Sequence, residues 1–164
     1  RQWSRGLGDV YKRQLFANTQ LAYEDLDDEM KKKINDLEVI HSASLPYADD
    51  GFYATEKDNR AMKILPSKKA KETQLHPLVK RHSETKKKCL FINPVYTIAI
   101  NEYSDEDSFL LLSYLYEHMT QEKYVYRHKW SENMLLMWDN RTVVHQADGG
   151  YDGYERLLHR ITIN

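Results

Sequence analysis

The stretch that decides the fold lies near the C-terminal end, where residues 138–163 read WDNRTVVHQADGGYDGYERLLHRITI. Two short runs of β-forming residues flank a glycine-rich turn, and glycine permits the positive φ angles that a tight turn needs. The first run contains Val143 and Val144, ends at His145 and comes after a bend predicted at Asn140 and Arg141. The stretch therefore predicts two strands that carry two histidines, His145 and His159, and two arginines, Arg156 and Arg160.

The second run, residues 156–163, alternates in a way that assigns its side chains to two faces. In a β-strand, successive side chains point to opposite sides. Arg156 and Arg160 would then share one face, while Ile161 and Ile163 would share the other with Leu157 and His159. The apolar face belongs against a core, so the arginine face would look into water or an anion-binding cavity.

These residues resemble the C-terminal signature of the TauD/TfdA-type dioxygenases, which are Fe(II)- and 2-oxoglutarate-dependent enzymes on a double-stranded β-helix. Upstream motifs occur in the order that the family shows: HPLV at 76–79, INP at 92–94, HMTQ at 118–121 and YRHKW at 126–130. The resemblance implies a mainly β fold with flanking helices, which is a partial jelly roll of the cupin-like kind. It extends over roughly residues 15–163.

The resemblance also implies a role for each matching residue of the signature. His145 would be the distal histidine of a two-histidine, one-carboxylate iron site, which leaves three coordination positions for 2-oxoglutarate and O2. Arg156 would bind the remote carboxylate of 2-oxoglutarate, because a guanidinium donates two parallel hydrogen bonds. Arg160 would bind the anionic group of a small organic substrate, with a sulfonate such as taurine as the first candidate.

Each of these residues also has a structural interpretation. A histidine is often a core or surface residue, and this chain has seven. Arg156 and Arg160 could be exposed ion-pair partners of Glu155 or Asp152, which would contribute little stability. Asp148 lies three residues after His145, one too many for a His-X-Asp pair, and is interpreted as a turn former.

Length, composition and charge are those of one ordinary domain of 164 residues. The formal net charge of -1 gives no indication of a nucleic-acid or membrane partner. No apolar run approaches the roughly 20 residues of a membrane span. Cys89 is the single cysteine, which favours a reducing, cytoplasmic location. A homo-oligomer is compatible with the sequence, which does not specify the oligomeric state.

The first fourteen residues, RQWSRGLGDVYKRQ, differ in character from the rest of the chain. Residues 5–14 look like a translated sequencing adaptor, so the domain is expected to comprise residues 15–164. A genuine but unusual terminus is the alternative. In the family, the His-X-Asp pair precedes the position of Leu15, so the resemblance implies that residues 15–164 are the C-terminal part of the enzyme and lack two iron ligands.

Further elements are predicted upstream of the signature. Asp27 would cap the second of two helices between Asn18 and Ile34, and Ser104 would cap an apolar helix that packs on the sheet through Phe109, Leu110, Leu112, Leu115 and Tyr116. Strands are predicted at 37–42, 76–82, 88–93, 124–130 and 134–138, the last four as two hairpins. His118 would lie in the last turn of the apolar helix and interact with its dipole.

Residues 43–70 show little periodicity and are interpreted as a long excursion over the substrate, with Tyr47, Phe52 and Tyr53 as lid aromatics; a mobile surface loop is the alternative. Two function classes remain open on this sequence. The first is a 2-oxoglutarate-dependent dioxygenase that is inactive as this fragment. The second is a catalytically silent jelly-roll module that binds a small acid or a protein.

Overall fold

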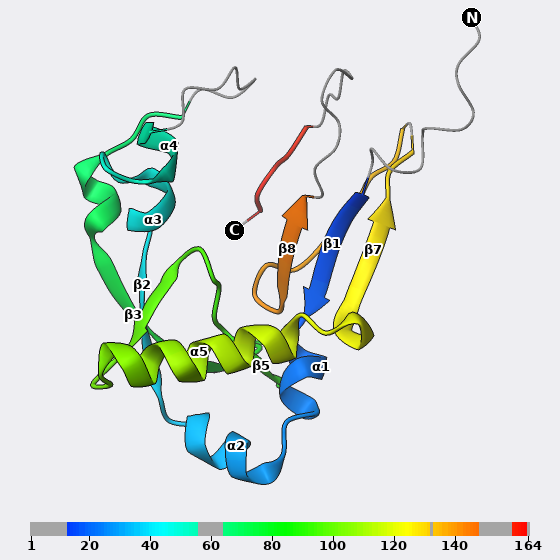
Figure 1. Ribbon diagram of the computed structural model, residues 1–164. Coiled ribbons are helices and arrows are strands. Elements are labelled where there is room, and N and C mark those ends of the chain that lie inside the picture. The colour runs from blue at the N-terminus through cyan, green and yellow to red at the C-terminus, as the bar shows by residue number, and fades with distance from the viewer. Residues whose placement is uncertain (1–12, 56–63, 132, 148–158, 164) are drawn as a thin grey trace, which may run out of the picture.

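The computed structural model describes residues 13–55, 64–131, 133–147 and 159–163. Two three-stranded sheets, in the orders β7-β1-β8 and β3-β2-β6, are joined by a two-stranded hairpin, β4-β5. Helix α5 runs along one end of both sheets in Figure 1, with α1 and α2 beside it. The fold is therefore mainly β with flanking helices, as the sequence predicts.

Eight strands and five helices make up the described structure, with two 3-10 turns. The strands are β1 (Arg13–Asn18), β2 (Glu38–Ser42), β3 (Thr73–Pro77), β4 (Val79–Arg81), β5 (Lys88–Leu90), β6 (Thr97–Ile100), β7 (Val125–Lys129) and β8 (Val143–Ala147). The helices are α1 (Thr19–Glu24), α2 (Asp28–Ile34), α3 (Ser44–Tyr47), α4 (Phe52–Thr55) and α5 (Asp105–Met119), and the 3-10 turns are η1 (Lys68–Lys71) and η2 (Glu122–Tyr124).

Strand β1 is the centre of the first sheet and pairs antiparallel with both β7 and β8. Phe16 lies opposite Tyr126 on one side and opposite His145 on the other. Directly opposed residues project from the same face of a sheet. Phe16, Tyr126 and His145 therefore share one face, and this register fixes the direction in which His145 points.

Strand β2 is the centre of the second sheet, and its pairing with β6 contains a bulge. Ile40 lies opposite Ala99, but His41 lies opposite Thr97, so Ile98 has no partner on β2. A bulge changes the direction of the side chains beyond it. Here it brings the hydroxyl of Thr97, in place of the apolar Ile98, next to the His41 ring.

Both predicted helix caps are confirmed. The Asp27 carboxylate accepts a hydrogen bond from the Met30 amide, and the Ser104 hydroxyl accepts one from the Asp107 amide. Such caps satisfy amides that lack partners within the helix. The two helices after Asn18 and the strand near 37–42 are confirmed as α1, α2 and β2.

The core lies where α5 meets the second sheet and α1. Leu115 and Met119 are fully buried there against Ile100 and Val39. The prediction that all the apolar residues of α5 pack inward was wrong for Phe109 and Leu110, which are exposed. Because a helix turns 100° per residue, two adjacent positions on its outer face cannot reach the core.

Two strand predictions were wrong, and a third is confirmed only in part. Strand β7 pairs with the distant β1 instead of forming a hairpin with 134–138, and described residues in 133–138 form no strand. Described residues 159–163 form no strand either, and Ile161 and Ile163 are 88% and 87% exposed; residues 156–158 lie outside the described ranges. The predicted hairpin of 76–82 with 88–93 is confirmed as β4 paired with β5, but the strand divides at Leu78, and residues 76–77 belong to β3, which pairs with β2. Apolar runs predict extended chain, but hydrogen-bonding partners depend on the whole fold.

Candidate active site

His145 projects from β8 onto an aromatic surface. Its ring stacks on Phe16 of β1 at a centroid distance of 6.1 Å, and the Trp138 ring lies 5.1 Å away. No hydrogen bond engages the imidazole within the described part of the chain. Partial burial, together with the positive charge of Arg160, lowers the pKa of His145. The ring is therefore neutral at pH 7 and has a lone pair for a ligand bond.

Arg160 approaches His145 from the C-terminal segment. Its guanidinium carbon lies 5.9 Å from the centre of the Trp138 ring, a cation–π arrangement. Trp138 thus contacts both His145 and Arg160. Arg160 was predicted to project inward from a regular strand. Its segment forms no strand in described residues 159–163, but the guanidinium does lie near His145.

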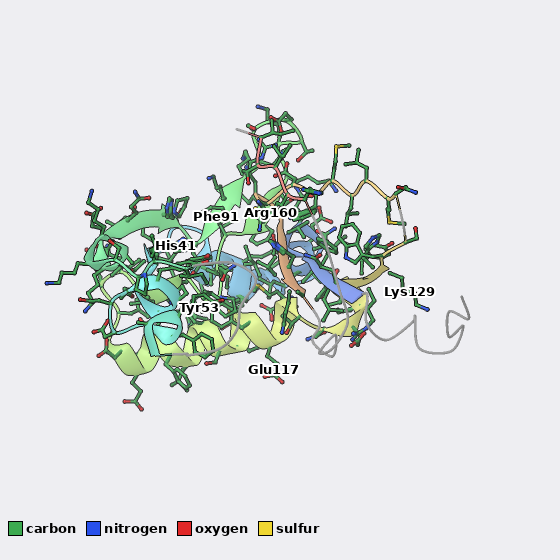
Figure 2. The ribbon with its side chains drawn as sticks, turned by 90° about the horizontal axis from the view of Figure 1, so that it is seen from above. His41, Tyr53, Phe91, Glu117, Lys129 and Arg160 are labelled. Carbon is green, nitrogen blue, oxygen red and sulfur yellow. The ribbon has the colours of Figure 1, made fainter. Side chains whose placement is uncertain are left out.

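His145 and Arg160 line one cavity of about 740 Å³ that opens between the two sheets. His41 and His76 of the second sheet line it as well, with Phe91 between β5 and β6. Figure 2 shows His41, Phe91 and Arg160 gathered toward this region, whereas Lys129 and Glu117 lie at the periphery. The cavity therefore has an imidazole and a guanidinium on one side and two further imidazoles on the other.

The excursion between β2 and β3 contributes aromatic rings to the same cavity. Tyr47 and Tyr53 line it with their rings 5.4 Å apart, and Tyr96 lies beside them. Burial and the neighbouring Tyr47 phenol raise the pKa of Tyr96, so its hydroxyl stays protonated as a hydrogen-bond donor. Phe52 stacks edge-on against Tyr53 but is itself exposed. Of the three predicted lid aromatics, two thus reach the cavity.

A second cluster of ionisable groups lies beside the 139–142 turn. The His82 Nδ1 atom accepts hydrogen bonds from the amides of Thr85 (3.1 Å) and Glu84 (3.3 Å). The ring proton must then be on Nε2, which donates to Asp139 at 3.0 Å. The Arg141 guanidinium binds the carboxylates of both Asp139 and Glu84.

This arrangement is a structural ion-pair network. In the described part of the chain it is the only group of three potential metal ligands, but its imidazole nitrogens and both carboxylates already have protein partners. A metal on His82 Nε2 would have to displace the proton that Asp139 accepts. The network instead anchors the 139–142 turn, which precedes β8, to the turn between β4 and β5.

Comparison with known proteins gives the family. The model of the "Taurine catabolism dioxygenase TauD, TfdA family" matches residues 13–162. The chain belongs to the TauD/TfdA dioxygenase family.

Similar proteins span several named activities. The chain is 34% identical to an alkylsulfatase of Acinetobacter baylyi, over 90% of this chain and 46% of that protein. It is 31% identical to an alpha-ketoglutarate-dependent sulfonate dioxygenase of Saccharomyces cerevisiae, over 89% and 32%. It is 33% identical to an alpha-ketoglutarate-dependent 2,4-dichlorophenoxyacetate dioxygenase of a Burkholderia species, over 80% and 41%. The chain therefore spans less than half the length of each of these relatives.

Solved structures of TauD/TfdA-type proteins have the same fold. The crystal structure of AAD-2 in complex with Mn(II) and N-oxalylglycine matches with a TM-score of 0.68 and 32% identity, over 87% of this chain and 46% of that one. A putative alpha-ketoglutarate-dependent 2,4-D dioxygenase from Burkholderia xenovorans matches with a TM-score of 0.68 and 27% identity, over 84% and 50%. The partial jelly-roll architecture predicted from the sequence is thereby confirmed.

The residues of this TauD/TfdA chain fit one part of an iron site. His145 has an unprotonated imidazole without a hydrogen-bond partner among the described residues, as an iron ligand requires. Within the described ranges, no group of three potential ligands includes His145. Arg156, the predicted 2-oxoglutarate residue, lies outside those ranges. The described structure thus places one imidazole, that of His145, and one guanidinium, that of Arg160, at the cavity wall.

Sequence reasoning did not assign site roles to His41, His76, Phe91 and Tyr96. The only available signal was alternation: Val39 and His41 share a face of β2, and His76 lies opposite Val39. That signal becomes visible only when β2 is known to pair with β3.

In the described ranges, no helix is long and apolar enough to cross a membrane.

Proposed function

We propose that residues 15–164 are the C-terminal part of an Fe(II)- and 2-oxoglutarate-dependent dioxygenase that hydroxylates a small anionic organic molecule. The supporting observation is that His145 and Arg160, from separate segments, line one cavity and both contact Trp138. Membership of the TauD/TfdA family supports the cofactors, and the N-oxalylglycine in AAD-2 has the skeleton of 2-oxoglutarate with an NH in place of one CH2.

In this proposal each residue has a separate task. His145 donates its lone pair as one of three protein ligands to the iron, Arg156 binds the remote carboxylate of 2-oxoglutarate, and Arg160 binds the anionic group of the substrate. Iron, 2-oxoglutarate and O2 together supply the oxidising chemistry for a C–H bond. Trp138 keeps the Arg160 guanidinium at a fixed position relative to His145, and this position selects the carbon of the substrate that reacts.

The proposed substrate is an organic anion, with a sulfonate such as taurine as the first candidate. Relatives named for sulfonates and for 2,4-dichlorophenoxyacetate both act on anions, which suits a guanidinium at the cavity wall. Tyr47 and Tyr53 of the 43–70 segment line the cavity and would contact the organic part of the molecule. We further propose a cytoplasmic location, which the single buried and unpaired Cys89 supports.

The test uses a chimera in which residues 15–164 are fused after the N-terminal half of the Acinetobacter baylyi alkylsulfatase. The chimera should form succinate in a reaction that needs both Fe(II) and 2-oxoglutarate, whereas the chain alone should form none because it supplies one of three ligands. His145→Ala should abolish turnover, and Arg156→Ala should mainly raise the 2-oxoglutarate requirement. His118→Gln, whose ring contacts the Ala22 carbonyl, is the matched histidine control. Near-normal turnover in His145→Ala would remove this residue from the ligand set.

A catalytically silent binding module remains the second candidate. It is favoured by the observation that His145 belongs to no three-ligand group within the described ranges. If the folded chimera binds small anions but forms no succinate at any Fe(II) concentration, this second function replaces the first.

A further inference from the structure

The second sheet carries two histidines on the cavity wall that the proposed reaction does not use. His41 of β2 and His76 of β3 both line the cavity, and their ring centroids are 4.9 Å apart. Phe91 completes the group, stacked on His41 at 5.7 Å and edge-on to His76 at 5.5 Å. The Lys80 ammonium lies 4.2 Å from the centre of the Phe91 ring. This packing holds all three rings in place.

The His41 ring already has a hydrogen-bond partner within the protein. Its Nε2 atom lies 2.9 Å from the Thr97 hydroxyl, which the β2–β6 bulge places opposite it. Burial and the neighbouring His76 lower the pKa of His41, which keeps the ring neutral at pH 7. His41 is therefore a positioning residue.

The His76 ring differs from the His41 ring in its hydrogen bonding. It is half-buried and lines the cavity, yet no atom in the described part of the chain forms a hydrogen bond with it. An imidazole carries at least one N–H group in either protonation state. A donor without a protein partner, held in place by two rings and facing a ligand cavity, can bind an acceptor oxygen of a ligand.

We infer that His76 is a specificity-determining residue that binds a second acceptor group of the substrate, remote from the anionic group bound by Arg160. The inference rests on the proposed function in that the cavity is taken as the substrate cavity. The two residues come from different parts of the fold, since Arg160 lies against Trp138 and His76 lies on β3. The preferred substrate is therefore an organic anion with an acceptor oxygen at its far end.

The arrangement does not indicate a second metal site. Only two imidazoles meet here, and the Nε2 atom of one of them, His41, already has the Thr97 hydroxyl as its partner. The remaining free donor is a single N–H group, which suits a carboxylate, a hydroxyl or a carbonyl oxygen.

The experiment measures binding of paired probes to the chain by titration calorimetry. Each pair has a sulfonate alone and the same sulfonate with a distal carboxylate: propanesulfonate with 3-sulfopropionate, and benzenesulfonate with 4-sulfobenzoate. The distal carboxylate should tighten binding by about tenfold in at least one pair, as expected for one hydrogen bond to a charged group. His76→Leu should remove this gain, and His76→Gln, which retains an N–H donor, should restore part of it.

The controls separate recognition by His76 from general attraction of a second negative charge. His118→Gln should keep the full gain, and Arg160→Leu should weaken binding of both members of a pair equally. A gain that persists in His76→Leu, or no gain in either pair, overturns the inference. If the gain depends on His76 but the chimera forms no succinate, the proposed function fails and the inference stands. If the chimera is active and the gain persists in His76→Leu, the inference alone fails.

Discussion

At the scale of single residues, the site depends on which histidine nitrogens form hydrogen bonds within the protein and which are available to a ligand. His82 has protein partners on both nitrogens and His41 has one on Nε2, whereas the rings of His145 and His76 have none within the described residues. Sequence alone cannot separate these two groups, because all four residues are the same in type. Hydrogen bonding therefore distinguishes structural histidines from candidate ligand-binding ones.

The ion pairs of Arg141 with Asp139 and Glu84 should make the stability of the fold depend on pH in the acidic range. Hydrogen bonds from Arg141 hold the pKa values of Asp139 and Glu84 below their ordinary range. A lowered carboxyl pKa stabilises the fold fully above the unfolded value of about 4, and this stabilisation is lost as the pH falls through the folded value. We expect the urea midpoint of Arg141→Met to fall less steeply than that of the wild type between pH 6 and pH 3.

The control for this measurement is Lys32→Met, which removes an exposed positive charge from α2 and leaves the network intact. Its midpoint should show the wild-type pH dependence. Parallel curves for Arg141→Met and the wild type would show that the network contributes no pH-dependent stability.

At the scale of elements, α5 packs only half of its apolar side chains into the core. Its N-cap and its buried positions result from local pattern, and Leu115 lies at the centre of the buried side. Tyr116, on the boundary of that side, has a buried hydroxyl without a hydrogen-bond partner among the described residues, and burial raises its pKa to about 12. The helix thus packs against both the core and β6.

Two alanine substitutions on α5, one on its buried side and one on its exposed side, test this difference between the two sides. Leu115→Ala should lower the free energy of unfolding by about 2–5 kcal/mol, because it leaves a cavity among fully buried side chains. Phe109→Ala should cost far less although it removes more atoms, because the Phe109 side chain is 69% exposed. Urea unfolding monitored by circular dichroism gives both values. Equal losses would mean that the Phe109 face is also covered.

At the scale of the whole molecule, large apolar side chains remain uncovered beside the first sheet. Leu135 and Met137 are 83% and 79% exposed, and Ile161 and Ile163 are similarly exposed. Strands β7 and β8 each have one neighbour in this sheet within the described part of the chain. Exposed apolar groups beside unpaired strand edges favour association between chains.

We therefore expect the chain to self-associate as its concentration rises. The double variant Leu135→Lys, Met137→Lys should shift sedimentation toward the monomer without lowering the unfolding midpoint, since neither side chain is buried. Glu29→Lys with Asp28→Lys on α2, which adds positive charge elsewhere, is the matched control. Equal association of both variants would show that the 135–137 surface is not where the chains meet.

The sequence by itself determined the short-range features of this protein. The caps at Asp27 and Ser104, the bend before Val143 and the strand around His145 all depend on residues within a few positions of one another. The family signature also lies in one continuous stretch, so the matching of His145 and Arg160 to that signature needed no structure.

Only the tertiary structure decided which strands pair and which side chains face the cavity. Strand β1 pairs with segments more than 100 residues away, and the 134–138 and 159–163 runs stay unpaired although they have the composition of strands. The role inferred for His76 likewise depends on a β2–β3 pairing and on a bulge in β6. The physical reason is that propensity acts within a segment, whereas hydrogen-bonding partners and burial result from competition among all segments of the folded chain.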